Sequence, residues 1–186
     1  SGAAEQQVND TLHACLSHVY GGDGRLAPPT TAPVADSLHA FDQRIFTAAA
    51  DMARIASTAD GGSGWADQGL VYVPERCRVP GAACRVHISL HDCGTRDAPA
   101  LPAPGNMTAA EVALARLGES TGVVVLMPRL AGRHVRARRT QDVDRGCWDV
   151  FGQLGEDYAH QSSAHLAPIL PMLEALGVVV PSSASA

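Results

Sequence analysis

The chain has 186 residues, of which 46% are apolar and 4% aromatic, and its formal net charge is −5. This length and apolar content predict a folded domain with an aliphatic core, and they argue against a wholly disordered chain. The negative charge argues against a general nucleic-acid binder, and no apolar run approaches the roughly 20 residues of a membrane span.

The first regular pattern covers residues 5–20. Apolar residues recur there three or four positions apart, which is typical of one face of an α-helix; they are Val8, Leu12, Cys15, Leu16 and Val19. Gly21 and Gly22 follow at once and favour a helix end at that point. Because Cys15 lies on the apolar face, we expect it to be a buried free thiol rather than a reactive one.

Loop signals dominate the chain that follows. Residues 21–36 are rich in Gly, Pro and Thr, and residues 60–64 are rich in glycine, so both predict irregular backbone. Between them, residues 47–57 are rich in alanine and predict a helical or irregular segment.

Two β-strands are indicated next, over residues 70–74 and 85–91. The second strand alternates, so that one face carries Val86, Ile88 and Leu90 and the other carries His87, Ser89 and His91. The loop between the strands contains proline and glycine and is bounded by Cys77 and Cys84. We therefore expect the two strands to form a β-hairpin.

A helix and a buried strand follow the proline-rich loop 94–106. Thr108 can cap a helix over 109–120, with Glu111 three residues later completing a capping box. The continuous apolar run Val123–Met127 is typical of a strand that is buried on both faces.

The last third of the chain begins with a polar, arginine-rich loop over 129–146. A final helix is predicted over 161–176, although Pro168 and Pro171 should kink it or delay its start. The valines at 178–180 predict one more strand before a Ser/Ala tail.

Four stretches of this sequence carry a resemblance to a known family. They read SLHAFDQ at residues 37–43, LVYVPERC at 70–77, CRVHISLHDC at 84–93 and GCWD at 146–149. In this order they resemble the poly(3-hydroxybutyrate) depolymerase family of secreted α/β-hydrolase esterases. The family pattern runs roughly YVPxxC, then CR-hydrophobic-HxxLHGC, then hydrophobic-VVLxP, and finally GCWDWWG.

The resemblance implies an α/β fold with an α/β-hydrolase-like mixed sheet flanked by helices. It corresponds to the C-terminal half of a circularly permuted hydrolase, so the sheet is expected to be incomplete and to lack the nucleophile-elbow segment. We expect a single domain over residues 1–176 and a terminal strand or flexible tail over 177–186. An incomplete sheet leaves an open edge beside apolar strands, which predicts a chain that is not a stable free monomer.

The cysteines at the family stretches are expected to be paired. Cys93 and Cys147 each stand in one stretch, and the spacing of Cys77 and Cys84 suits a small closed loop better than a zinc knuckle. We therefore expect the disulfides Cys77–Cys84 and Cys93–Cys147, which predict a secreted or periplasmic protein. Cys15 is then the remaining free thiol.

The resemblance also implies site residues. An esterase of this kind stabilises the negative oxygen of its tetrahedral intermediate in an oxyanion hole. The backbone N–H of Cys93 is implied as one donor, with His91 and Asp92 in the oxyanion loop. Asp92 stands where the family has glycine, and its charge opposes an oxyanion unless the side chain points away or pairs with an arginine. The alternative is that residues 85–93 are only a central strand and its exit turn.

Trp148 is implied as part of the hydrophobic wall of the substrate crevice, and a tryptophan that only packs against the core or surface is the alternative. A nucleophile of the Gly-x-Ser-x-Gly type is missing. Ser63 has only the first glycine and precedes the first core strand, and Ser183 has neither glycine and lies in the tail. We expect a flexible turn at Ser63 and a disordered tail at Ser183, so the catalytic Ser, Asp and His belong to sequence outside this chain.

No metal ion or other cofactor is expected. Two pairs of histidines lie five positions apart and therefore do not share a helix face: His13 with His18, and His160 with His165. His87 and His91 share a strand face, but no third ligand is indicated. The basic stretch Arg133–Arg139 predicts a solvated loop, and binding of an anionic polymer or a partner surface is the alternative.

The leading hypothesis is therefore part of a carboxylic-ester hydrolase that acts on poly(3-hydroxybutyrate) or related short-chain hydroxyalkanoate esters. The alternative is a non-catalytic binding or interaction module, a pseudoenzyme derived from that family. The expected partners are a polyester or short-chain ester substrate and either a complementary hydrolase half or a second copy of the chain. Nucleic acid and a membrane span are not expected.

Overall fold

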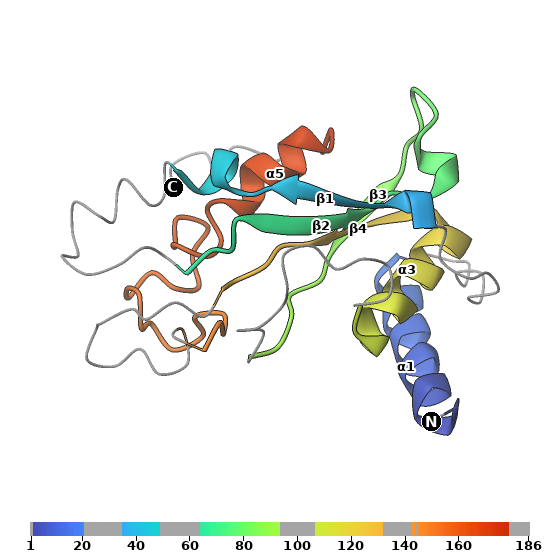
Figure 1. Ribbon diagram of the computed structural model, residues 1–186, viewed down its shortest axis with the longest axis horizontal. Helices are drawn as coiled ribbons and strands as arrows, with labels where there is room; N and C mark the ends of the chain where they lie inside the picture. Colours follow the sequence, from blue (N-terminus) through green and yellow to red (C-terminus); the bar gives the residue numbers. More distant parts are fainter. Residues whose placement is uncertain are drawn as a thin grey trace. The chain divides into compact units, whose positions relative to one another are not determined.

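The computed structural model describes residues 2–20, 35–48, 64–93, 107–131, 143 and 145–178. These residues form an α/β fold with a four-stranded mixed sheet in the order β1-β2-β4-β3 (Figure 1). The chain divides into two compact units. The first unit comprises residues 1–40, 70–89 and 100–126, and the second comprises residues 41–69, 90–99 and 127–186.

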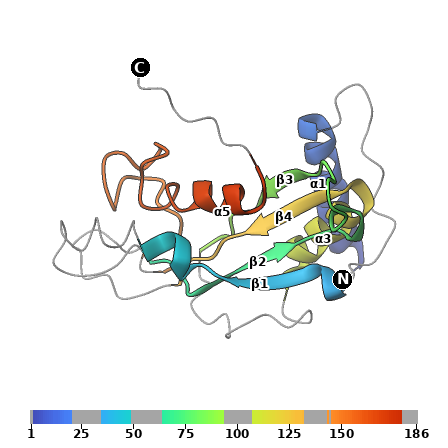
Figure 2. The same ribbon diagram turned by 90° about the horizontal axis from the view of Figure 1, so that it is seen from above.

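The strands are β1 at Leu38–Asp42, β2 at Gln68–Tyr72, β3 at Arg85–Ile88 and β4 at Val123–Met127. β2 runs opposite to both of its neighbours (Figure 2). The N–H of Val73, directly after β2, donates to the carbonyl of Ser37, directly before β1, over 2.8 Å. Trp65, which precedes β2, forms an antiparallel bridge with Leu130. β3 and β4 pair in parallel.

β4 is the central strand that its sequence predicts, because all five of its residues are buried. The predicted hairpin of residues 70–74 and 85–91 is wrong, since β4 lies between β2 and β3. β4 takes the inner position, and the chain therefore crosses over it between β2 and β3. The crossover contains the short 3₁₀ helix η2 at Glu75–Cys77.

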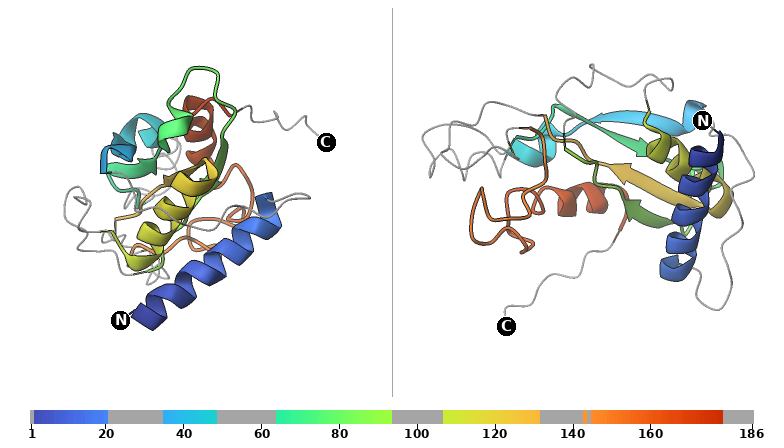
Figure 3. Two further views of the ribbon diagram at one scale, coloured as in Figure 1. Left: turned by 90° about the vertical axis from the view of Figure 1, so that its right-hand side faces the viewer. Right: turned by 90° about the horizontal axis from the view of Figure 1, so that it is seen from below.

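In the first unit the helices α1, Gly2–Tyr20, and α3, Ala109–Thr121, pack against each other (Figure 3). Leu16 is the buried residue among those whose burial is described in α1, with an exposed fraction of 2%. The expectation of a buried Cys15 is wrong, because this free cysteine is exposed. Adjacent helical residues point about 100° apart, so the helix can bury Leu16 and turn Cys15 toward solvent. Val19, one turn after Leu16, is also exposed.

The start and end of α3 follow directly from local sequence. Thr108 accepts a hydrogen bond from the Glu111 N–H, and the Glu111 carboxylate accepts one from the Thr108 N–H, which completes the predicted capping box. Gly122 ends the helix in the left-handed conformation, at a φ of 67°. A residue with a side chain is disfavoured there, so glycine is the natural helix stop.

The crossover after β2 is fastened to the end of α3. The buried Tyr72 hydroxyl donates to a Glu119 carboxylate oxygen over 2.7 Å, and the Arg76 guanidinium donates to the Thr121 carbonyl. The Cys77–Cys84 disulfide, whose Cα atoms are 5.9 Å apart, closes the loop that follows, as expected from the sequence. These links fix the backbone that leads into β3.

In the second unit the fully buried Gln43 joins three backbone segments just beyond the strand ends. Its side-chain N–H groups donate to the carbonyls of Ala66 and Arg129, over 2.8 and 3.0 Å, and its carbonyl accepts from the Arg129 N–H over 2.9 Å. One side-chain amide therefore links the backbone at Ala66 and Arg129.

The last helix, α5, spans Ile169–Ala175 and is shorter than the predicted 161–176. Pro168 lies at its N-cap and the residues before it form turns, so proline delays the helix as expected. Most of the predicted strand 178–180, the stretch Arg133–Arg139, and both Ser63 and Ser183 lie outside the described residues. None of the described helices has the length and apolar character to cross a membrane.

Candidate functional site

The predicted site residues come together in the second unit. The Cys93–Cys147 disulfide is present, and it links the turn after β3 to the residue before Trp148. The pairing expected from the resemblance therefore occurs in the structure. It holds the two family stretches, HDC and GCWD, side by side, although they are 54 residues apart in sequence.

His91 has a defined hydrogen-bonding role in this turn. Its Nε2 accepts the Leu130 N–H over 2.9 Å, which leaves Nδ1 as the nitrogen that carries the proton of the neutral ring. Nδ1 lies 2.7 Å from the Asp92 carbonyl oxygen and donates to it. His91 thus holds the peptide between Asp92 and Cys93 in one orientation.

The orientation of that peptide sets the direction of the Cys93 N–H. In a trans peptide the N–H points opposite to the preceding carbonyl. Because the Asp92 carbonyl faces His91, the Cys93 N–H points away from the imidazole. Asp92 is exposed, and its carboxylate has no hydrogen bond to another described residue.

Trp148 lies within a group of four rings. Its indole centroid is 5.7 Å from that of His91, 5.5 Å from that of Trp65 and 5.5 Å from that of His165. The rings of Trp65 and His165 meet Trp148 nearly edge to face, a favourable aromatic arrangement. The Trp65 N–H donates to the Ala164 carbonyl over 3.0 Å, whereas the buried Trp148 Nε1 has no partner among the described residues.

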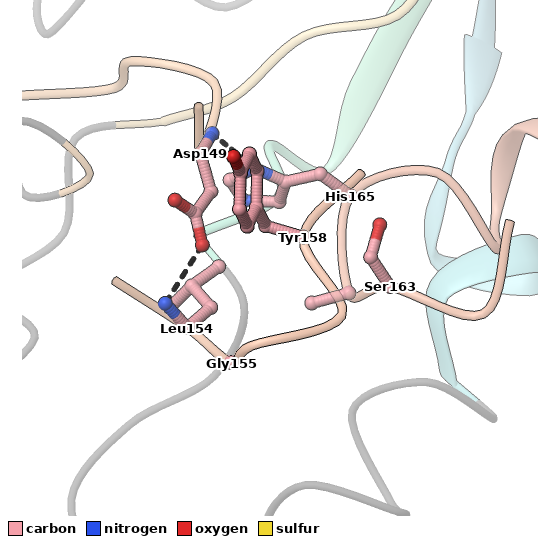
Figure 4. A pocket seen from close by; sticks show the side chains of 7 residues that line it. Asp149, Leu154, Gly155, Tyr158, Ser163 and His165 are labelled. Atoms are coloured by element: carbon pink, nitrogen blue, oxygen red, sulfur yellow. Dashed lines mark hydrogen bonds between the residues drawn. The ribbon is translucent and has the colours of Figure 1, made fainter. Parts of the chain in front are cut away.

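The segment after Trp148 is organised by the buried carboxylate of Asp149. It accepts backbone N–H groups from Phe151, Gln153 and Leu154 over 3.1, 2.9 and 2.7 Å. The Asp149 N–H in turn donates to Nδ1 of the buried His165 over 2.9 Å (Figure 4). The Trp148 side chain therefore packs among three other rings, and the backbone that follows it is fixed by the hydrogen bonds of Asp149.

A small pocket adjoins this turn. The aspartate, serine and histidine that line it are not arranged as a hydrolase triad. Its lining includes Asp149, Ser163 and His165, and it is too narrow to hold a water molecule (Figure 4). The Asp149 carboxylate binds backbone N–H groups rather than the imidazole, and the Ser163 hydroxyl accepts the Leu166 N–H over 3.2 Å. These side chains are structural.

Sequence reasoning named Cys93, His91, Asp92 and Trp148, and the structure gathers them around one disulfide. It missed Trp65, His165 and the role of Asp149, whose contacts to the site are mostly distant in sequence. The one local signal was Asp149 followed by Gly152, since an aspartate often accepts N–H groups of the turn it begins. In the described part of the chain, no three His, Cys, Asp or Glu side chains are grouped as for a metal ion.

Comparison with known proteins gives a fold relationship. A PHB depolymerase variant complexed with an R3HB trimer matches with a TM-score of 0.52 and 18% identity, over 78% of this chain and 41% of that chain. The PHB depolymerase from Penicillium funiculosum matches with a TM-score of 0.51 and 19% identity, over 78% of this chain and 43% of that one.

The chain has a PHB depolymerase-like fold. It spans less than half the length of either solved chain, at 41% and 43%. No protein-family model matches the sequence, and no curated protein matches it either.

Proposed function

We propose that this chain is part of a carboxylic-ester hydrolase that acts on poly(3-hydroxybutyrate) or related short-chain hydroxyalkanoate esters. In this proposal the catalytic Ser, Asp and His come from sequence outside the chain. The PHB depolymerase-like fold and the pairing of Cys93 with Cys147 support it. The two disulfides also suit an extracellular or periplasmic protein.

The orientation of the Cys93 amide is the observation that carries the proposal. When a serine attacks an ester carbonyl, the carbonyl oxygen becomes an oxyanion, and backbone N–H groups fixed beforehand stabilise it. The Cys93 N–H is fixed on one side by His91, which holds the preceding carbonyl, and on the other by the disulfide. Cys93 is the proposed oxyanion donor and His91 its positioning residue.

Trp148 is the proposed substrate wall. An indole presents a large apolar face, which suits the methyl and methylene groups of a hydroxybutyrate unit. The ring contacts with His91, Trp65 and His165 fix its plane, so the wall is formed before substrate arrives.

Asp92 favours a second candidate, a non-catalytic binding module. Its exposed carboxylate follows His91 directly and precedes the proposed donor, where a negative charge opposes an oxyanion. A module that binds the ester without cleaving it has no need for that donor. The two candidates differ in catalysis but share the Trp148 wall.

Binding and catalysis are tested separately. A Trp65→Phe variant leaves Trp148 as the remaining tryptophan, and titration with a 3-hydroxybutyrate trimer should change its emission in a saturable way. The Trp148→Phe variant, which retains Trp65, is the matched control and should show little change. The absence of binding in the first variant, with its fold intact by circular dichroism, would contradict both candidates.

For catalysis, the isolated chain should not hydrolyse p-nitrophenyl butyrate above background or react with an organophosphonate serine probe. Labelling of one of its serines would contradict a triad supplied from outside. The reading frame upstream of Ser1 separates the two candidates: a Gly-x-Ser-x-Gly elbow there supports the enzyme, and its absence supports the binding module.

A further inference from the structure

The backbone that holds His91 belongs to a short antiparallel pair in the second unit. Trp65 and Leu130 form the bridge of this pair, and their neighbours exchange the backbone hydrogen bonds. One of these bonds joins the Ala66 N–H to the Arg129 carbonyl over 3.0 Å. Backbone groups alternate in direction along a strand, so the Leu130 N–H points away from Trp65. On that outer side it donates to Nε2 of His91 over 2.9 Å.

Gln43 holds the same backbone from the inner side. It follows β1 and is fully buried. Its amide binds both backbone groups of Arg129, because its carbonyl accepts the Arg129 N–H over 2.9 Å and its nitrogen donates to the Arg129 carbonyl over 3.0 Å. The nitrogen also donates to the Ala66 carbonyl over 2.8 Å. Gln43 and His91 therefore hold two consecutive residues, Arg129 and Leu130, from opposite sides.

A line of hydrogen bonds leads from this backbone to the Cys93 amide. Because the Leu130 N–H occupies Nε2 of His91, the proton of the neutral ring lies on Nδ1. Nδ1 then donates to the Asp92 carbonyl over 2.7 Å, and this carbonyl belongs to the same peptide as the Cys93 N–H. A shift of the Leu130 N–H would release the ring and, with it, the direction of the Cys93 N–H.

A second connection leads from Gln43 to Trp148. The Ala66 carbonyl that Gln43 binds directly follows Trp65 in the chain. The Trp65 ring lies 5.5 Å from the Trp148 ring, centroid to centroid, and its N–H donates to the Ala164 carbonyl over 3.0 Å. Gln43 thus also holds the backbone from which the Trp65 ring reaches Trp148.

We propose that Gln43 is a positioning residue for both parts of the site, the Cys93 amide and the Trp148 ring. Its importance for ester chemistry rests on the proposed function, in which these two groups are the oxyanion donor and the substrate wall. The hydrogen bonds themselves involve neither substrate nor triad. A purely structural role for Gln43 predicts that its loss lowers stability alone, whereas a positioning role predicts a change in the protonated nitrogen of His91.

Nitrogen-15 NMR of the full chain tests this difference, since it distinguishes a protonated ring nitrogen from one with a free lone pair. Measured at about pH 8, where an ordinary histidine ring is neutral, His91 of the wild type should carry its proton on Nδ1. His91→Gln assigns the signals. Gln43→Met keeps the side-chain length and removes all three hydrogen bonds. One neutral hydrogen bond shifts an equilibrium about fivefold, so the excess of the Nδ1–H form should fall about fivefold.

Tyr72→Phe is the matched control. It also removes a hydrogen bond from a fully buried side chain, the one to Glu119, but it lies in the first unit. It should leave the His91 signals and the Trp65 indole N–H signal unchanged, whereas Gln43→Met should shift the Trp65 signal as well. The same His91 change in both variants would mean a general effect of lost stability and would overturn the proposal.

An unchanged His91 ring in a folded Gln43→Met chain would also overturn it. The wild type gives a result that requires no variant, because a His91 proton found on Nε2 would rule out the bond from Leu130. These outcomes are separate from the proposed function. A chain that shows the Gln43→Met change but does not bind the 3-hydroxybutyrate trimer supports the positioning by Gln43 and contradicts the ester site.

Discussion

Replacing both cysteines of the Cys93–Cys147 disulfide with alanine opens a covalent ring between residues 54 positions apart. A crosslink restricts the unfolded chain, and the lost entropy grows with the logarithm of the ring length. For this ring the loop-closure relation gives about 4 kcal/mol at 25 °C. The Cys77–Cys84 ring spans only 7 positions, and its loss should cost about 2.5 kcal/mol by the same relation.

The free energy of unfolding of the variant without the long ring should therefore be about 1.5–2 kcal/mol lower than that of the variant without the short ring. Urea unfolding followed by circular dichroism measures this difference, with Cys15→Ala as a control that breaks no disulfide. Tryptophan emission adds a local readout, because loss of the long ring frees the segment before Trp148. Equal costs for the two rings, or a larger cost for the short one, would refute the loop-entropy reasoning.

Two further predictions concern buried polar groups. Gln43→Glu keeps the side-chain shape but removes the N–H donors to Ala66 and Arg129, so it should lower the free energy of unfolding in urea by about 2–4 kcal/mol. The exposed Gln68→Glu is the control. A loss below about 1 kcal/mol for Gln43→Glu would contradict the assigned role. Burial lowers the pKa of His87, so the unfolded chain binds more protons at mildly acidic pH. The His87 contribution to stability is thus present above the unfolded pKa of about 6.5 and is lost as the pH falls toward the folded pKa. When the urea midpoint is measured between pH 8 and 5, it should fall less with decreasing pH in the His87→Gln variant than in the wild type. An equal fall in the two proteins would contradict this role of His87.

Elements whose signals are local followed closely from the sequence. The α3 helix was predicted as 109–120 and spans Ala109–Thr121, because its capping box and its glycine stop lie at its own ends. The strand Val123–Met127 was predicted with its burial, since a run of apolar residues needs cover on both faces. Pro168 likewise marked a delayed helix start.

Features that depend on distant contacts did not follow. The hairpin expected for β2 and β3 failed because the decision between adjacent pairing and a crossover rests on β4, which comes later in the chain. At the candidate site, the sequence indicated Cys93 and Trp148 through a resemblance. It gave no sign that Leu130 would fix the His91 ring, because that contact joins residues 39 positions apart.

The fastening of the crossover to α3 has a consequence for the order of folding. The bonds from Tyr72 to Glu119 and from Arg76 to Thr121 join residues 47 and 45 positions apart, whereas Cys77 and Cys84 are 7 apart. Short rings close sooner than long ones, so oxidation can complete the small ring while α3 is still unformed. The crossover then reaches its final place only when α3 has formed and docked. In pulse-labelled refolding, amides of β3 should therefore gain protection together with those of α3 and not with the closing of the small ring.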